Sequence, residues 1–290
     1  MATQLERRLR DFVDRVDEME AFCRMLDDRE HPVMVVWGPG GIGKSSLIAR
    51  MMHEVALRNA QRAEVIYTDD NIPDYLAVMR KSRDDLGVEG FGELTDLINY
   101  FTDPQYTLNV NVSGAANVSV GANMNAQGAV INEMAGIVIR DVMIAQPRND
   151  LGVTESERRS RLTKTFIDAL AARGNRLLVV FFDAVEKMTT STHTWLWDQL
   201  ITGVTDAGLA HVRFVICGRT EPPINRYMRQ LVVMSELKPL AVSDVAEYLA
   251  RRGIPEGERT IVAQTLHRLF KGNPFEIANA VDNLLGPTTS

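Results

Sequence analysis

The sequence Gly38-Pro39-Gly40-Gly41-Ile42-Gly43-Lys44-Ser45 says most about the fold of this chain. It follows an apolar run at residues 33–37, which predicts a strand buried on both faces, and it precedes apolar residues at helical spacing over 47–55. Glycines let the chain turn tightly enough for consecutive amides to face one anion, and the N-terminus of the following helix adds its dipole. The spacing is that of a P-loop; the alternative is a glycine-rich turn with a chance lysine.

The side chains of this loop predict a nucleoside triphosphate site. Lys44 can reach the β- and γ-phosphates and also counts as a catalytic residue, while Ser45 can ligate Mg²⁺. We therefore expect ATP or ADP with Mg²⁺ as the cofactors, and the sequence has no Asn-Lys-x-Asp motif for reading guanine. The expected phosphate contacts come from consecutive residues, namely Gly38, Pro39, Gly40, Gly41, Ile42, Gly43, Lys44, Ser45 and Ser46.

A carboxylate for the magnesium is expected at the end of a second buried strand. The apolar run 177–182 ends at Asp183, which we assign to the metal together with Ser45; the alternative is an aspartate that begins an ordinary loop. We expect this strand to neighbour the strand at 33–37. Glu186 is a candidate catalytic residue that orients or deprotonates the attacking water, although an exposed surface glutamate would have the same spacing.

An arginine follows a third apolar run. Arg219 comes just after the strand-like residues 212–217, so we expect it at the same carboxyl edge of the sheet as Lys44 and Asp183. A guanidinium there can pair with the γ-phosphate and report whether it is present, which makes Arg219 a candidate catalytic residue. The competing interpretation is a salt bridge within the loop.

Strand-like and helical patterns alternate over most of the chain. The apolar runs that predict strands lie at 33–37, 65–67, 177–182, 212–217 and 231–234. The helical patterns lie at 13–26, 47–55, 74–101, 158–173 and 194–201. This alternation predicts an α/β fold, a P-loop NTPase with a mainly parallel sheet flanked by helices.

Beyond Pro239 the pattern changes to helices alone. Ser243 is predicted to cap the first of them, and the sequence favours a small all-helical domain at this end. The predicted organisation is an N-terminal helical segment at 1–30, a P-loop nucleotide-binding domain at 31–238 and the helical domain at 239–290.

One segment fits neither pattern. Residues 106–132 are rich in Gly, Asn, Ser and Val, and valine alternates with small polar residues in the fragments 109–112 and 117–120. Alternation of this kind predicts short hairpin strands in an insertion, while a flexible loop of low complexity is the other interpretation.

Composition narrows the class of protein. The 290 residues include 32 Lys and Arg against 38 Asp and Glu, without a basic block, so no clear nucleic-acid signal is present. We expect no membrane association, since no apolar run approaches the length of a bilayer crossing, and we expect a cytoplasmic protein. Cys23 and Cys217 lie in apolar segments far apart, which predicts two reduced core thiols.

Five motifs, in order along the chain, resemble those of the STAND class of signal-transduction ATPases, which includes NACHT and NB-ARC proteins and is related to the AAA+ ATPases. The first, Phe-Val-Asp-Arg-Val-Asp-Glu at 12–18, is similar to the family's Phe-Val-Gly-Arg-Glu motif, with Asp14 in place of the usual glycine. The others are the P-loop, a Walker B-like segment at 182–186, a sensor-like segment at 215–220, and Gly-Asn-Pro at 272–274, which is similar to the family's Gly-x-Pro motif.

The resemblance implies that adenine lies between Val13, Arg15 and Pro274, so that the nucleotide contacts both the P-loop domain and the helical domain. It implies an ATP-dependent molecular switch that hydrolyses slowly and controls assembly or signalling, with a role in bacterial defence by analogy alone. The expected partners are other copies of the chain or separate sensor and effector proteins, or the chain is a piece of a longer protein. Two alternatives stay open: an ATP- or ADP-dependent interaction module without hydrolysis, and an AAA+-like nucleic-acid remodeller.

Overall fold

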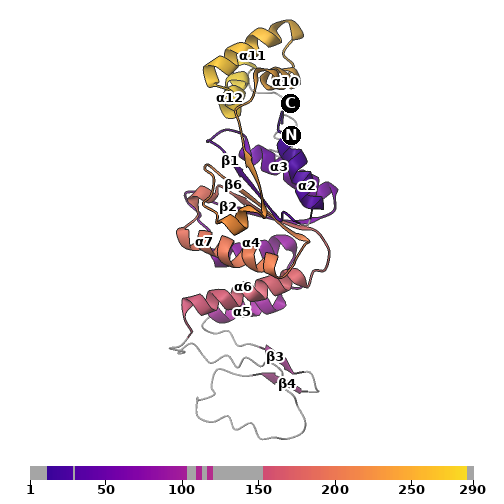
Figure 1. Cartoon of the computed structure of the whole chain (residues 1–290), viewed down its shortest axis with the longest axis vertical. Helices are drawn as coiled ribbons and strands as arrows, with labels where there is room; N and C mark the ends of the chain where they lie inside the picture. Colours follow the sequence, from indigo (N-terminus) through magenta and orange to yellow (C-terminus); the bar gives the residue numbers. More distant parts are fainter. Residues whose placement is uncertain (1–11, 29, 103–108, 113–115, 120–152, 286–290) are drawn as a thin grey trace. The chain divides into compact units, whose positions relative to one another are not determined.

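The structure, a computed structural model, describes residues 12–28, 30–102, 109–112, 116–119 and 153–285 (Figure 1). Two compact units are present. One is formed by the described residues up to Gly87 and from Arg173 onward, and the other by those between Val88 and Ala172. The first unit carries the predicted P-loop.

A parallel sheet of five strands, in the order β2-β5-β6-β1-β7, forms the centre of the first unit. The strands are β1 (Val33–Trp37), β2 (Gln61–Ile66), β5 (Leu178–Asp183), β6 (Val212–Gly218) and β7 (Val232–Glu236). The predicted α/β class with a mainly parallel sheet is confirmed. One expectation is wrong, because β6 lies between β1 and β5, so the strand that ends at Asp183 is not the neighbour of the strand before the P-loop.

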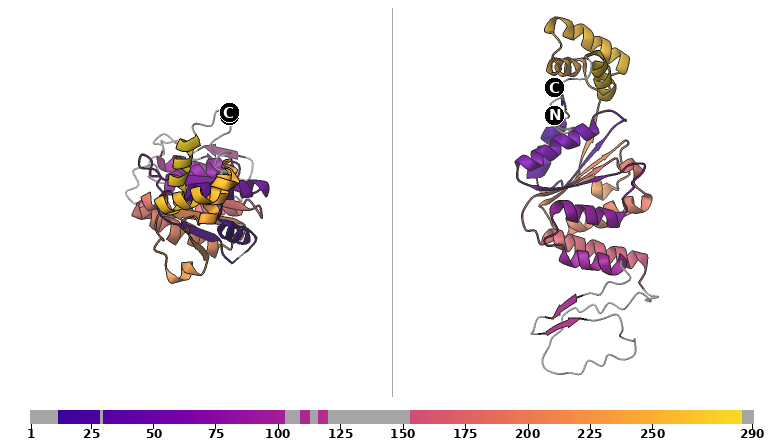
Figure 2. Two further views of the ribbon diagram at one scale, coloured as in Figure 1. Left: turned by 90° about the horizontal axis from the view of Figure 1, so that it is seen from above. Right: turned by 180° about the vertical axis from the view of Figure 1, so that it is seen from behind.

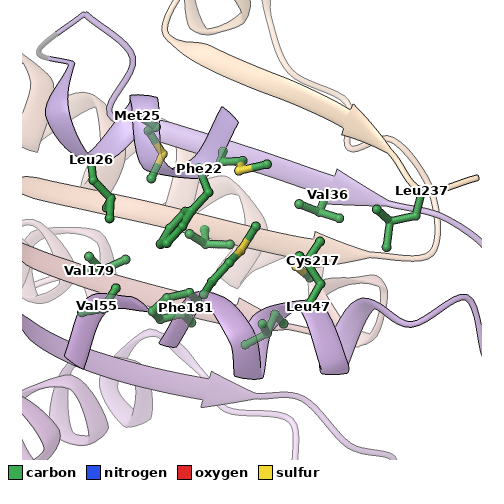
Figure 3. Packing of buried hydrophobic residues seen from close by; sticks show 14 of the residues in the cluster. Phe22, Met25, Leu26, Val36, Leu47, Val55, Val179, Phe181, Cys217 and Leu237 are labelled. Atoms are coloured by element: carbon green, nitrogen blue, oxygen red, sulfur yellow. The ribbon is translucent and has the colours of Figure 1, made fainter. Parts of the chain in front are cut away.

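Helices α2 (Val16–Asp27) and α3 (Lys44–Leu57) cover one face of this sheet. Figure 3 shows their buried side chains pointing toward β1, β5 and β6, with Phe22 and Phe181 meeting at a ring-centroid distance of 6.3 Å. Cys217 is fully buried in this cluster as predicted, but Cys23 is only partly buried, and both are free thiols. Burial of this kind is the main favourable term for the fold.

The opposite face is covered by α4 (Tyr75–Leu86) and by a helical run made of α7 (Thr190–Trp195), the π-helix η2 (Leu196–Ile201) and α8 (Thr202–Asp206), as the right-hand view of Figure 2 shows. The rings of Tyr75 and Trp195 lie 6.0 Å apart between α4 and α7. With both faces covered, β1 and the first five residues of β5 are continuous apolar runs, whereas the edge strand β2 carries Gln61, Arg62 and Glu64.

Three helices follow β7: α10 (Val242–Arg251), α11 (Glu256–Phe270) and α12 (Pro274–Leu285). They share a hydrophobic cluster of their own, to which Val13 from the N-terminal motif also belongs. The predicted cap at Ser243 is wrong, because α10 begins at Val242 and the carboxylate of Asp244 accepts a 2.6 Å hydrogen bond from the amide of Ala241. The remaining short elements of this unit are η1 (Val185–Lys187) and α9 (Arg226–Arg229).

The second unit contains α5 (Gly92–Thr102), α6 (Glu155–Ala171) and a two-stranded hairpin. Phe91 and Phe166 stack at 5.9 Å, and a capping box between Thr154 and Glu157 begins α6. Strands β3 (Asn109–Val112) and β4 (Ala116–Ser119) pair antiparallel, which confirms the predicted hairpin pattern there. The rest of the predicted insertion at 106–132 lies outside the described residues.

Candidate functional site

The P-loop lies between the end of β1 and the start of α3. Gly43 adopts a positive φ of 99° and Lys44 opens the helix, so the strand, tight turn and helix occur as the spacing predicts. The Lys44 Nζ donates hydrogen bonds of 2.7 Å to Gly38 O and 2.9 Å to Pro39 O. Burial lowers the pKa of Lys44, while the carboxylates of Glu186 and Asp183 act in the opposite direction.

Ser45 and Asp183, the predicted metal pair, are in direct contact. The Ser45 Oγ donates a 2.9 Å hydrogen bond to Asp183 Oδ2, and the amide of Ala184 donates one of 2.9 Å to Asp183 Oδ1. Burial raises the pKa of Asp183, and these two hydrogen bonds oppose the shift. A hydroxyl and a carboxylate that converge in this way are the hard oxygen donors that Mg²⁺ prefers, so the pair fits a magnesium ion.

Glu186 and Arg219 also meet at this edge of the sheet. The Arg219 Nε lies 3.0 Å from Glu186 Oε1, and the Arg219 backbone amide donates a 3.1 Å hydrogen bond to Glu186 Oε2. The left-handed conformation of Ala184, with φ of 60°, turns the chain from β5 into η1, which carries Glu186. Arg219 therefore forms a salt bridge, but its partner is the candidate water-orienting acid in η1 and not a residue of its own loop, as the competing interpretation had it.

The N-terminal motif contacts the P-loop through Arg15. Asp14 and Arg15 both have positive φ, 61° and 71°, so Asp14 occupies a conformation that suits the glycine it replaces. The Arg15 side chain is only 5% exposed, and its Nη2 donates a 3.0 Å hydrogen bond to Ile42 O. Val13 packs in the cluster of the C-terminal helices.

The start of α12 contacts the same loop. Asn273 Nδ2 donates a 3.2 Å hydrogen bond to Gly40 O, and the amide of Phe275 donates one of 3.2 Å to Gly41 O. A Cβ on Gly43 would lie 3.9 Å from Pro274 Cγ. The predicted residues Arg15 and Pro274 thus lie near the P-loop, whereas Val13 packs with the C-terminal helices. The contact of these three residues with adenine stays a prediction.

Sequence reasoning missed Asn273 and Phe275. An asparagine followed by proline is a typical helix start, because the side chain caps the first amides and proline suits the first turn. That signal could have located the beginning of α12. It could not have revealed the contact with Gly40, which lies 233 residues earlier in the chain.

The profile of the AAA ATPase domain family matches residues 11–215, which include the P-loop, Asp183 and Glu186. The chain belongs to the AAA ATPase domain family. Membership of this family implies nucleotide binding through the P-loop. No curated protein matches the sequence. Among the residues that the structure describes, none of the helices combines the length and the apolarity that a bilayer crossing requires.

Solved structures resemble this AAA ATPase domain at low sequence identity. Cdc6p from Pyrobaculum aerophilum has a TM-score of 0.52 and 11% identity, and the match covers 94% of this chain and 61% of that one. This chain therefore spans less than two thirds of Cdc6p, and the likeness concerns the fold alone. A STAND protein with a tetratricopeptide repeat sensor from Pyrococcus horikoshii has a TM-score of 0.41 and 14% identity over 91% of this chain and 28% of that one.

Proposed function

We propose that this AAA ATPase domain is a molecular switch that binds ATP with Mg²⁺ and hydrolyses it slowly to control assembly with itself or with separate sensor and effector proteins. The observation that carries the proposal is the pairing of Glu186 with Arg219, at 3.0 Å between Oε1 and Nε. Glu186, which would orient the water, is thus paired with Arg219, which would bind the γ-phosphate. Hydrolysis then requires that a γ-phosphate first compete for Arg219, which links turnover to the presence of ATP.

The remaining residues have separate tasks. Lys44 and the loop amides hold the phosphates, because a cation and several backbone donors there stabilise the negative charge. Ser45 and Asp183 would hold Mg²⁺, which when bound neutralises charge on the β- and γ-phosphates. Glu186, once released from Arg219, accepts a hydrogen bond from the attacking water and orients it in line with the γ-phosphorus.

The contacts between α12 and the P-loop support the assembly part of the proposal. Asn273 and Phe275 bind carbonyls of the same loop that would hold the phosphates, at 3.2 Å each. A nucleotide that alters this loop therefore biases the packing of the C-terminal helices, and a change in that packing is available to a partner. A role in defence would be a further step and rests on analogy alone.

The proposal is tested by identifying the nucleotide released on denaturation and by following phosphate release with ATP and Mg²⁺. Retained ADP and slow turnover are expected, together with tight ATP binding and about 100-fold slower hydrolysis in Glu186→Gln, in line with the loss of a general base. Binding without turnover in the wild type would favour the non-hydrolysing interaction module. Fast turnover that single-stranded or duplex DNA stimulates would favour the nucleic-acid remodeller.

A further inference from the structure

Three consecutive carbonyl groups of the P-loop are held from outside the loop. Gly40 O accepts from Asn273 Nδ2 at 3.2 Å, Gly41 O from the amide of Phe275 at 3.2 Å, and Ile42 O from Arg15 Nη2 at 3.0 Å. The donors come from two segments, the start of α12 and the N-terminal motif. None of them belongs to the sheet or to α3.

Because the peptide group is planar, a contact that holds a carbonyl also orients the amide that follows it. The described part of the chain has no cis peptide bonds, and in a trans peptide the carbonyl and the following amide point in opposite directions. Holding the three carbonyls therefore aims the amides of Gly41, Ile42 and Gly43 to the other side of the loop. These are the donors on which a P-loop relies for its phosphates.

The hydrogen bonds of Asn273 fix the positions of the oxygen and the nitrogen of its side-chain amide. Its Oδ1 accepts from the amides of Phe275 at 3.0 Å and Glu276 at 3.3 Å, which caps α12. The oxygen is thereby assigned to the cap, and the amide nitrogen faces Gly40 O. One side chain both begins the helix and holds the loop.

The contact made by Arg15, like that made by Asn273, can be traced to the C-terminal helices α10 to α12. Arg251 of α10 donates a hydrogen bond to the carbonyl of Phe12, and Val13 is buried with the C-terminal helices. Two residues further on, the guanidinium of Arg15 reaches Ile42 O. The contacts of Asn273 and of Arg15 thus both connect the phosphate loop to the C-terminal helices.

We infer that Asn273 and Arg15 are positioning residues that set the affinity of the P-loop for phosphate groups, whichever base the nucleotide carries. The inference rests on the proposed nucleotide site and does not depend on hydrolysis. It assigns Arg15 a different task from the adenine contact that the family resemblance implies. An adenine contact would affect only ligands that carry a base, whereas positioning of the P-loop would affect every ligand that carries phosphate groups.

The test measures dissociation constants of fluorescent ADP and of inorganic tripolyphosphate, by competition, for the wild type and three variants. Asn273→Ser keeps an oxygen that can cap α12, but its side chain is too short to reach Gly40 O. Asn273→Asp keeps the cap and adds a charge. Arg15→Met removes the Nη2 donor to Ile42 O. The control is Asn225→Asp, since Asn225 caps α9 by accepting a 2.8 Å hydrogen bond from Met228.

Asn273→Ser and Arg15→Met are expected to weaken both ligands about tenfold, the equivalent of one lost hydrogen bond. The melting temperature of the nucleotide-free Asn273→Ser protein and the affinities of Asn225→Asp stay near those of the wild type. Unchanged affinity in Asn273→Ser with weaker binding in Asn273→Asp alone would overturn the inference, because charge repulsion would then suffice. Weaker ADP with unchanged tripolyphosphate in Arg15→Met would return Arg15 to an adenine contact. A wild type that binds neither ligand would overturn the proposed function as well.

Discussion

Ser45 and Asp183 lie 138 residues apart in the sequence, yet the Ser45 hydroxyl donates a 2.9 Å hydrogen bond to the Asp183 carboxylate. The contact joins the first turn of α3 to the end of β5, across the intervening strand β6. It brings together the two oxygens that we assign to Mg²⁺.

Asp183→Asn should abolish the magnesium dependence of hydrolysis. The amide cannot supply the negative charge that holds the cation, so phosphate release is expected to fall at least about 100-fold, or about 3 kcal/mol. Phosphate release at several Mg²⁺ concentrations checks this, with Ser45→Ala as the companion variant. A magnesium response equal to that of the wild type would remove Asp183 from the metal site.

In the absence of metal, Asp183→Asn should also change how the free energy of unfolding depends on pH. Burial raises the pKa of Asp183 in the folded state, so the folded state binds the proton more tightly than the unfolded chain. Its stabilising contribution is therefore full below the ordinary aspartate pKa and is lost as the pH rises through the folded-state pKa. In urea unfolding with EDTA, the free energy of unfolding of Asp183→Asn should rise relative to that of the wild type between about pH 3 and pH 7. A relative loss over that range would contradict the prediction.

Arg219→Ala should affect nucleotide discrimination far more than stability. The Arg219 side chain is 61% exposed, and exposed ion pairs contribute less than about 1 kcal/mol, so the melting temperature should hardly move. The preference for ATP over ADP should fall about tenfold, because a charge-assisted contact with the γ-phosphate is worth about 1.5–3 kcal/mol. Isothermal titration with ADP and a non-hydrolysable ATP analogue measures the ratio. An unchanged ratio would leave Arg219 as a partner of Glu186 only.

Gly41→Ala should be more damaging than Gly40→Ala. At Gly41, with φ of 76°, a Cβ would lie 2.9 Å from Asn273 Oδ1 and 3.0 Å from Phe275 Cβ, whereas at Gly40 it would meet nothing within 4 Å. The left-handed conformation adds about 1–2 kcal/mol for any residue with a Cβ. Thermal unfolding of the two nucleotide-free proteins compares them. Equal melting temperatures would contradict both the left-handed conformation of Gly41 and the approach of α12 to the loop.

Arg213→Met should destabilise the fold by more than about 2 kcal/mol. The buried guanidinium donates to the carbonyls of Met25 at 2.8 Å and Ala210 at 2.7 Å, and its loss leaves buried acceptors unsatisfied. Arg24→Met is the matched control, because the Arg24 side chain is 71% exposed. Urea unfolding of both variants decides the point, and equal stabilities would show that water replaces the lost donors.

Several features of this protein could be read from local sequence because they depend on local chemistry. The apolar run of β1, the glycines and the Lys44-Ser45 pair are contiguous, so they predicted the strand, the loop and the helix that the structure contains. The runs before Asp183 and Arg219 likewise predicted strand ends at one edge of the sheet. Patterns of this kind are reliable because a strand buried on both faces is apolar at nearly every position.

Strand order and side-chain partners could not be obtained in that way. Nothing in the two apolar runs indicates that β6 lies between β1 and β5, since either order would bury the same residues. The pairing of Glu186 with Arg219 and the contact of Asn273 with Gly40 join residues 33 and 233 positions apart. Local sequence was therefore enough to predict the fold class and to propose residues for phosphate and magnesium. The tertiary structure alone decided which of them touch, because contacts between distant segments depend on how the helices and the sheet pack together.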